Sequence, residues 1–440
     1  MASNGRSHSR IGFLYRQQTL RLDPNRVQAT ALARACGTRR WAYNRALAEQ
    51  ITAYRTTGSF LSPAAQMRAI VELKHTAEFA WLNEVSKCAP VAAIQDLHQA
   101  LMTFLLKRGG PQGRRVGFPK FRKKHRGREI VRLHGCIAIS GGTVGLPRIG
   151  RVRIMPREPR LEGRIVSVTC FCEAGRWYVS LRLEIPSPAS IPEPPHGEMV
   201  GLDLGIRTLA VDSNGRSYNG ARALLRGQRR LARANRSLSR KQRGSRNRLK
   251  AVRRLQRVHA RVRHQRMDHL HKLTTHLART KRAVVIEDLA VGGMIRSRRF
   301  SRSLADQSFG TVRRQLEYKC RASGSRLLVA PRFFASTRRC SGCGSTWEGI
   351  TLSDREYICP NPACGLRLDR DHNAALNLRW WGQQTVSEVT AGRAETINAC
   401  GARVSPGRTQ RAIRSSASGR AQAVKQEPSA AGLPVDQSRT

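Results

Sequence analysis

Apolar residues recur at three- and four-residue spacing over most of residues 24–107, the period of helices that bury one face. The first two predicted helices are "LRLDPNRVQATALARACG" and "TRRWAYNRALAEQITAYRTTG", divided at Gly37, with Asp23 at a cap position and Pro24 as the first helical residue. Two more are expected in "SPAAQMRAIVELKH" and "PVAAIQDLHQALMTFLLKR". We therefore expect a helical domain that ends before the glycine-containing "GGPQGRR".

The period changes to two between residues 131 and 186, where "GCIAISGGTVGLP", "GRVRIMP" and "RIVSVTCFCEAGRWYVSLRLEI" predict a meander of β-hairpins. A proline-rich linker, "PSPASIPEPPHG", follows the meander. The next segment, "MVGLDLGIRTLAVDSNGRSY", predicts a strand, a turn at Ser213-Asn214-Gly215 and a returning strand. A new domain is therefore expected to begin near residue 197.

The rest of the chain alternates between basic, apolar and polar segments. Residues 222–266 contain eighteen arginines and lysines and no acid, and their recurring Leu and Val predict a long basic helical hairpin broken near Gly244. "RAVVIEDLAVGG" predicts a short buried strand that ends in two acids, and "FGTVRRQLEYKCRASG" predicts a helix. Beyond about residue 385 the apolar pattern fades, which predicts a disordered tail.

Composition narrows the class of partner. The 440 residues include 80 basic and 29 acidic ones, and a net charge of +51 indicates a polyanionic partner, hence nucleic acid.

No apolar run reaches the roughly 18–20 residues of a membrane span, and "MASNGRSHSRIGF" lacks the apolar segment of a secretory signal, so we expect a cytoplasmic protein. Eleven cysteines, seven of them scattered, favour buried thiols and one metal site over a disulfide framework.

Four cysteines form the pattern C-x2-C-x15-C-x4-C, at Cys340, Cys343, Cys359 and Cys364. Two such pairs can close a tetrahedron around zinc at about 2.3 Å, with no vacancy for a substrate. The alternative is a set of unrelated core cysteines. We expect a structural zinc site that holds a small finger.

Three carboxylates lie in or near the predicted apolar strands: Asp203 at mid-strand in "GLDLG", Glu287 at the end of the "VVIED" strand, and Asp371 in "DRDHN" at the predicted start of a helix. Taken singly, they could be a turn acid, a strand-end charge and a helix N-cap. Together, in a basic domain, they indicate metal binding, because a buried carboxylate is costly unless it is paired or coordinates a cation. Oxygen ligands suit magnesium or manganese. Asp369 is the rival for the third position.

Several motifs of the chain, including those that contain the acids and the cysteines, resemble the motifs of a known protein family. "GLDLGIRTLAVDSNG", "VVIEDLAV", "VRRQLEYK", "CSGCG…CPNPACG" and "DRDHNAALNL", with "WAYNRAL" and "FPKFRKK" nearer the start, resemble the TnpB family of transposon-encoded RNA-guided nucleases, from which type V CRISPR effectors derive. The resemblance covers residues 13–382. The chain departs from it in the C-x4-C pair, where the family often has C-x2-C, and at Ala335, where it often has Ser.

The resemblance implies a multidomain α/β and β fold, in which a RuvC-like nuclease of the RNase H type with an inserted zinc ribbon follows a β-barrel wedge domain interrupted by a helical recognition domain. The implied segments are the wedge (1–23 and 126–195), the recognition domain (24–125), the nuclease (196–336 and 367–385), the zinc ribbon that binds target nucleic acid (337–366) and a disordered tail (386–440). Asp203, Glu287 and Asp371 match the three catalytic acids, which would hold two divalent ions.

The basic hairpin is expected to contact the phosphates of a guide–target duplex through Arg229, Arg230, Arg233, Lys241 and Lys250. The alternative is a solvated face. Trp41, Tyr43 and Phe118 could stack on bases, although apolar core is the expected use of each.

The resulting hypothesis is a transposon-associated RNA-guided DNA endonuclease that uses Mg²⁺ or Mn²⁺, a structural Zn²⁺, a guide RNA from the transposon end and double-stranded target DNA. Three alternatives remain open at this point. They are a miniature type V CRISPR effector, an RNA-guided DNA-binding regulator without cleavage, and a zinc-ribbon nucleic-acid-binding protein without a guide.

Overall fold

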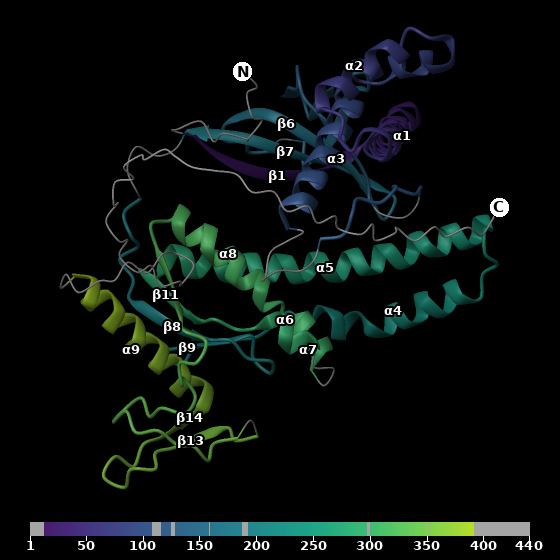
Figure 1. Cartoon of the computed structure of the whole chain (residues 1–440). Helices are drawn as coiled ribbons and strands as arrows, with labels where there is room; N and C mark the ends of the chain where they lie inside the picture. Colours follow the sequence, from purple (N-terminus) through teal and green to yellow (C-terminus); the bar gives the residue numbers. More distant parts are fainter. Residues whose placement is uncertain are drawn as a thin grey trace, which may run out of the picture. The chain divides into compact units, whose positions relative to one another are not determined.

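The structure of the protein is a computed structural model that describes residues 13–107, 116–124, 128–157, 159–186, 192–296, 300–351 and 353–390 (Figure 1). The chain divides into two units, 1–386 and 387–440. Nearly all of the second unit, and with it the predicted disordered tail, lies outside the described residues.

One continuous helix, α1 (Arg26–Thr57), replaces the two helices predicted near the start of the chain. Asn25 starts it with a capping box: its side chain accepts from the backbone N–H of Gln28 at 2.9 Å, and the Gln28 side chain accepts from the N–H of Asn25 at 3.1 Å. Gly37 does not end the helix, because its neighbours along the chain are buried in a core. That burial outweighs the cost of about 1 kcal/mol that glycine brings to a helix interior. The helix ends at Gly58, whose φ of 70° suits a left-handed cap.

Three further helical segments follow α1, and the first and last of them agree with the two helices predicted there, whereas the middle one was not predicted. They are α2 (Pro63–Leu73), the 3-10 helix η1 (Ala77–Glu84) and α3 (Cys88–Lys107). Together with α1 they enclose a core that includes Leu47, Ile94 and Leu97.

The three aromatic residues considered for base stacking serve this core. Tyr43 is buried in it, Trp41 packs with ring centroids 5.6 Å from Phe79, and Phe118 packs 5.4 Å from Phe104. The core interpretation of these residues is therefore confirmed.

A seven-stranded antiparallel sheet contains the first described strand and the predicted meander. Its strands are β1 (Phe13–Asp23), β2 (Glu129–Leu133), β3 (Ile139–Ser140), β4 (Thr143–Leu146), β5 (Gly150–Met155), β6 (Arg164–Glu173) and β7 (Arg176–Pro186). Their order is β2-β6-β7-β1-β5-β4-β3, so β1 lies inside the sheet between β7 and β5. Asp23, predicted as a helix cap, is the last residue of β1 and pairs with Arg153. Over the described residues the strand pairing leaves the sheet open between β2 and β3, rather than closed into a barrel.

The helix α1 and this sheet share one hydrophobic core. Leu32, Ala35 and Cys36 of α1 pack in the same cluster as Val131 and Leu133 of β2. The first helix and the sheet therefore stabilise each other, although α1 and β2 are far apart in the sequence.

A five-stranded sheet carries two of the predicted acids. Its strands are β8 (Met199–Asp203), β9 (Ala210–Asp212), β10 (Ser217–Tyr218), β11 (Ala283–Glu287) and β12 (Arg326–Ala330), in the order β10-β9-β8-β11-β12. β8, β11 and β12 are parallel, whereas β9 and β10 run antiparallel to their neighbours. β8 and β11 are almost wholly apolar because helices cover both of their faces.

The two faces of this sheet contact different helices, as side-chain alternation requires. On one face, Val200, Leu202, Val284 and Ile286 share a cluster with residues of α5 (Arg246–Thr280) and α8 (Phe309–Ala322). On the other face, Met199, Ala283 and Val285 share a cluster with Leu378 of α9 (Arg370–Thr390).

Two glycines allow α9 to approach this second face closely. A Cβ atom on Gly201 of β8 would clash with the carbonyl oxygen of Ala375, and one on Gly382 of α9 would clash with the Val285 side chain. The helix therefore lies almost directly on β8 and β11, and its first turn is fixed relative to their ends. It also continues past the predicted boundary at residue 385.

The basic segment forms the predicted helical hairpin of α4 (Ala223–Ser239) and α5, which run side by side (Figure 1). Gly244, with a φ of 84°, lies in the turn, and the Ser245 side chain caps α5 by accepting from the N–H of Arg248 at 3.1 Å. The remaining elements are α6 (Val291–Arg296), α7 (Ser301–Gln307), β13 (Glu356–Ile358) and β14 (Arg367–Asp369). Among the described residues, none of the helices combines the length and apolar content that a membrane crossing requires.

Candidate active site and metal centre

Asp203 and Glu287 are the last residues of the neighbouring parallel strands β8 and β11. The register pairs Gly201 with Val285, so the two acids, each two residues further along, lie side by side at the carboxyl end of the sheet. Because side chains alternate along a strand, both acids point to the face that α9 covers. Open α/β sheets bind their ligands at this edge.

Asp371 reaches the same region from the first turn of α9. Its Oδ2 atom lies 3.9 Å from the position that a Cβ on Gly205 would take, in the loop that follows Asp203. The rival acid, Asp369, is exposed, and its Oδ1 accepts hydrogen bonds of 3.0 Å from the backbone N–H groups of Asp371 and His372. Asp369 is therefore the N-cap of α9, the role that the sequence had offered to Asp371.

Burial and the two neighbouring acids raise the pKa of Asp203, the most buried of the three. Burial raises the pKa of Asp203 well above its usual value, and the charges of Glu287 and Asp371 raise it further, while Arg370 opposes them. Burial also raises the pKa of Glu287, against a hydrogen bond that lowers it. Buried carboxylates that repel one another are stabilised by a cation, and hard oxygen ligands suit Mg²⁺ or Mn²⁺. The donor set therefore fits divalent metal ions.

The second acid of "VVIED" has a separate environment. Asp288 forms ion pairs with Arg313 at 2.5 Å and with Arg332 at 2.8 Å. The hydrogen bonds from these two arginines hold its pKa below the usual value. Alternation along β11 thus sends Glu287 towards the other two acids and leaves Asp288 neutralised by arginines.

Two residues that contact the acids were missed by the sequence analysis. The Ser336 hydroxyl donates to Glu287, and the Arg370 guanidinium forms an ion pair of 3.1 Å with Asp371. Arg370 stands between the two acids of "DRDHN", which was the available signal, whereas a loop serine such as Ser336 carries no distinctive pattern. Both residues fix the orientation of a carboxylate.

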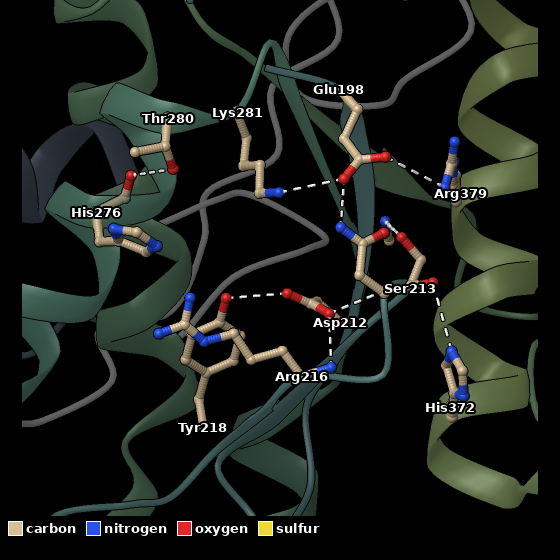
Figure 2. Close-up of polar contacts among 12 residues, drawn as sticks. Glu198, Asp212, Ser213, Arg216, Tyr218, His276, Thr280, Lys281, His372 and Arg379 are labelled. Carbon is tan, nitrogen blue, oxygen red and sulfur yellow. Dashed lines mark hydrogen bonds and ion pairs between the residues drawn. The ribbon is translucent and has the colours of Figure 1, made fainter.

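Asp212 is buried near this edge but has a structural role. Its Oδ1 accepts hydrogen bonds of 3.0 and 2.9 Å from two backbone N–H groups of the β9–β10 turn, and the Tyr218 hydroxyl donates to Oδ2 at 2.9 Å (Figure 2). His372 of α9 lies 3.4 Å from the Ser213 carbonyl oxygen of the same turn (Figure 2). Asp212 therefore shapes the turn that contacts the first turn of α9.

The four predicted cysteines come together in a separate cluster. The Sγ atoms of Cys340, Cys343, Cys359 and Cys364 all lie within 4.8 Å of one another. The Cys340–Cys364 and Cys343–Cys359 distances are 3.8 and 3.5 Å. Sulfur ligands about 2.3 Å from a tetrahedral zinc are separated by about 3.8 Å, so the donor set and its spacing fit zinc.

The ring of Tyr357 supports this cluster from the β13–β14 hairpin. Tyr357 is fully buried in the small core that includes Cys340, and its hydroxyl donates to the carbonyl oxygens of Arg338 and Ser345 at 3.1 and 3.3 Å. The two loops that carry the cysteine pairs are thereby joined through protein contacts as well.

The basic hairpin displays the five residues predicted to contact phosphates. Arg229, Arg230, Arg233, Lys241 and Lys250 are all exposed. Other basic residues of the hairpin have intramolecular roles: Arg248 donates to two backbone carbonyls in the turn, and Arg263 pairs with Glu173 of β6. Phosphate binding therefore remains a prediction for the exposed set.

Three family descriptions match separate stretches of the chain. "Probable transposase" matches residues 180–298, which include β8 to β11, and "Cas12f1-like, TNB domain" matches residues 309–378, which include the cysteine cluster. "Helix-turn-helix domain" matches residues 15–59, where the structure has the strand β1 and the single helix α1.

Whole-length similarity is found to curated proteins. The chain is 34% identical to a putative RNA-guided DNA endonuclease of Streptomyces pristinaespiralis, over 94% of this chain and 97% of that protein. It is 30% identical to the putative RNA-guided DNA endonuclease InsQ of Escherichia coli K12, over 88% and 94%. A solved Cas12f1–sgRNA–target DNA complex is similar with a TM-score of 0.46 and 11% identity, over 80% of this chain and 82% of that one. With its acids, its cysteine cluster and these relatives, the chain belongs to the TnpB family.

Proposed function

We propose that this protein is a transposon-associated RNA-guided DNA endonuclease whose metal ions are held by Asp203, Glu287 and Asp371. The observation that carries the proposal is the convergence of three acids from β8, β11 and α9 on one edge of a sheet, in a chain of net charge +51. The relatives from S. pristinaespiralis and E. coli, matched over nearly their whole lengths, support RNA guidance and DNA as the substrate.

The chain's own residues prepare this site for a phosphodiester. The β8–β11 register sets Asp203 beside Glu287, the Ser336 hydroxyl orients Glu287, and Arg370 holds Asp371. Without a cation, three carboxylates would repel a phosphate group, so cleavage should require Mg²⁺ or Mn²⁺. Divalent ions bound here would activate the attacking water and stabilise the leaving 3′-oxygen.

The strand order supports assignment of residues 196–336 and the start of α9 to a RuvC-like domain of the RNase H type. Two antiparallel strands lie on one side of β8 and two parallel strands on the other. We extend the last part of this domain along α9 to Thr390, because the helix continues without a break. Of the other segments, the seven-stranded sheet would be the wedge, and α1 to α3 the recognition domain.

The remaining parts would bind nucleic acid and zinc. The four thiolates would hold one structural Zn²⁺, because four protein ligands leave no position for substrate. The exposed arginines and lysines of the α4–α5 hairpin would contact the phosphate backbone of a guide–target duplex. Such contacts depend on charge and do not read the identity of the nucleobases. We further propose that the protein acts on DNA in the prokaryotic cytoplasm.

The test is cleavage of DNA by the complex with its own RNA. RNA that copurifies with the protein is sequenced, and a plasmid library with a matching target and randomised flanks is cut in the presence of Mg²⁺. Asp203→Ala, Glu287→Ala and Asp371→Ala should each abolish cutting while target binding, measured by gel shift, persists. The matched control is Asp369→Asn, which keeps a capping side chain on α9 and should cut normally.

Each alternative gives a different outcome. Cutting at the wild-type rate by all three alanine variants would refute the nuclease, and binding without cutting by the wild type would indicate a regulator. The absence of a discrete copurifying RNA would indicate a guide-independent protein. A repeat array beside the gene, in place of a transposon end, would indicate a CRISPR effector.

A further inference from the structure

We infer that Phe333 is a stacking site for a base of the single-stranded DNA that binds at the edge of the five-stranded sheet carrying Asp203 and Glu287. The inference rests on the proposed function. The side chain of Phe333 is 94% exposed, the largest exposure among the large hydrophobic residues of the described part of the chain. It lies in the loop between β12 and Cys340. Single exposed apolar residues are common on proteins, so its position and its rigid support carry the argument.

The residues on both sides of Phe333 contact the acids at the end of β11. Arg332 donates to the Asp288 carboxylate at 2.8 Å, and the Ser336 hydroxyl donates to Glu287. Residues three apart in a chain are separated by at most about 11 Å, so the Phe333 backbone lies within that distance of Ser336. The exposed ring is therefore carried by a short segment whose flanking residues contact the acids, close to where the strand must lie to be cut.

The loop that carries this ring is held in place. The Phe334 N–H donates to the Pro331 carbonyl oxygen at 3.0 Å, and the Ser336 N–H donates to that of Phe334 at 2.9 Å. The ring of Phe334 packs inward with its centroid 6.4 Å from that of Trp381 in α9. Phe333 is therefore presented outwards by a fixed backbone, and an aromatic ring with two side-chain torsions loses little entropy when it is covered.

A stacking site suits the strand that this enzyme would cut. Once a guide RNA pairs with one strand of the target, the displaced strand is single-stranded, and the faces of its bases are accessible for stacking. A phenyl ring can cover any base and reads no hydrogen-bonding pattern, so it would position the strand without selecting sequence. Arginine contacts to phosphates alone would leave the strand free to slide past the acids.

The experiment uses the full chain with its guide RNA and a target that carries 2-aminopurine, whose fluorescence is quenched by stacking. The cut site in the displaced strand is first located with the wild-type protein. The probe is then placed at three positions on each side of it, and fluorescence is read in the Asp203→Ala background, which binds without cutting. Phe333→Ala, Phe333→Leu and Phe333→Trp are compared, with Phe121→Ala as a control at another exposed phenylalanine, 51% exposed.

We expect one probe position to be quenched with Phe333 and with Phe333→Trp, and to lose its quenching in Phe333→Ala and Phe333→Leu, while Phe121→Ala leaves it unchanged. With Asp203 restored, Phe333→Ala should slow cutting about 5- to 150-fold, which corresponds to the roughly 1–3 kcal/mol that alanine replacement of a base-stacking residue costs, and Phe333→Trp should recover the rate. Thermal unfolding should not change, because the ring is outside the core.

Two outcomes would overturn the inference while the wild-type protein still cuts, and so leave the proposed function standing. One is unchanged quenching and cutting in Phe333→Ala. The other is full recovery by Phe333→Leu, which would indicate apolar contact without stacking. Failure of the wild-type protein to cut would instead refute the proposed function.

Discussion

Neighbouring acids in this chain differ in role because backbone geometry separates them. Glu287 and Asp288 are adjacent, yet one faces the other acids and the second is paired with Arg313 and Arg332. Asp369 caps α9, whereas Asp371, two residues further, contacts Arg370. Counting acids in a motif therefore does not identify a ligand. The strand face or the helix position does, and both can be read once the element boundaries are known.

The cysteine cluster gives a prediction at the scale of a residue. Cys343→Ser should lower the zinc content well below one ion per chain and unfold the β13–β14 hairpin, because a structural metal site contributes folding free energy directly. Metal content is measured by mass spectrometry, and folding of the hairpin by hydrogen exchange at Tyr357. Cys136→Ser, a change at an exposed cysteine outside the cluster, should keep full zinc. Full zinc in Cys343→Ser as well would refute the assignment.

At the scale of elements, the basic hairpin gives a prediction about salt. Replacing Arg229, Arg230 and Arg233 by glutamine should weaken binding to guide RNA or heteroduplex regardless of sequence. The slope of log K against log salt should become shallower by about 0.9 for each lost contact in a duplex, or about 0.7 in a single strand. Binding is measured by filter retention over a range of salt concentrations.

The control for the hairpin removes the same number of charges elsewhere. Arg16, Arg34 and Arg338 form ion pairs with Glu162, Glu84 and Glu348 at 2.7, 2.8 and 2.8 Å. Their joint replacement by glutamine should change the slope less, since these arginines are already paired. Equal slopes in the two triple variants would mean that the hairpin arginines act through net charge alone.

Glu198, just before β8, joins several elements and gives a prediction about pH. A hydrogen bond from Asn214, followed by Lys281 at 3.4 Å and Arg379, lowers its pKa, against partial burial (Figure 2). A carboxyl group whose pKa is lowered by folding stabilises the protein above its unfolded pKa of about 4.3. That contribution is lost as the pH falls through the folded value. It should stay below about 1 kcal/mol, because the side chain is 41% exposed and screened by solvent.

Accordingly, Glu198→Gln should lower the melting temperature at pH 7, and the difference from the wild type should shrink as the pH falls below 4. Thermal unfolding followed by circular dichroism at both pH values is the measurement. A difference that persists unchanged in acid would show that the Glu198 charge does not stabilise the fold.

Sequence patterns located most elements but not their partners. The apolar run of "VVIED" was sufficient to predict β11, and the spacing of the four cysteines was sufficient to predict that they cluster, since both signals are local. The helix end predicted at Gly37 was wrong, because the helix continues where its residues are buried in a core. That core is formed by residues far away in the sequence. The order of strands around β1, and the approach of α9 to Gly201, likewise depend on contacts between segments far apart in the chain. Ser336 was missed for the same reason.

At the scale of the whole molecule, the shared core of α1 and the seven-stranded sheet predicts cooperative unfolding. Leu32 is fully buried in that core. Leu32→Ala should lower the free energy of unfolding by about 2–5 kcal/mol, the usual cost of emptying such a site. Hydrogen exchange should rise in α1 and in β6 and β7 together. Faster exchange confined to α1 would show that the helix and the sheet unfold separately.

The place of β1 inside its sheet has a consequence for synthesis on the ribosome. Tyr15 of β1 bonds to Glu184 of β7, 169 residues later, and β5 also follows it in the chain. At about 5–20 residues per second, the strand waits roughly 10–30 s between its emergence and that of its partner. During that interval its backbone donors and acceptors are unpaired, while α1 can already form. The nascent chain therefore carries a strand without its pairing partners, followed by a helix that has already formed. Such an unpaired strand favours protection by a ribosome-associated chaperone.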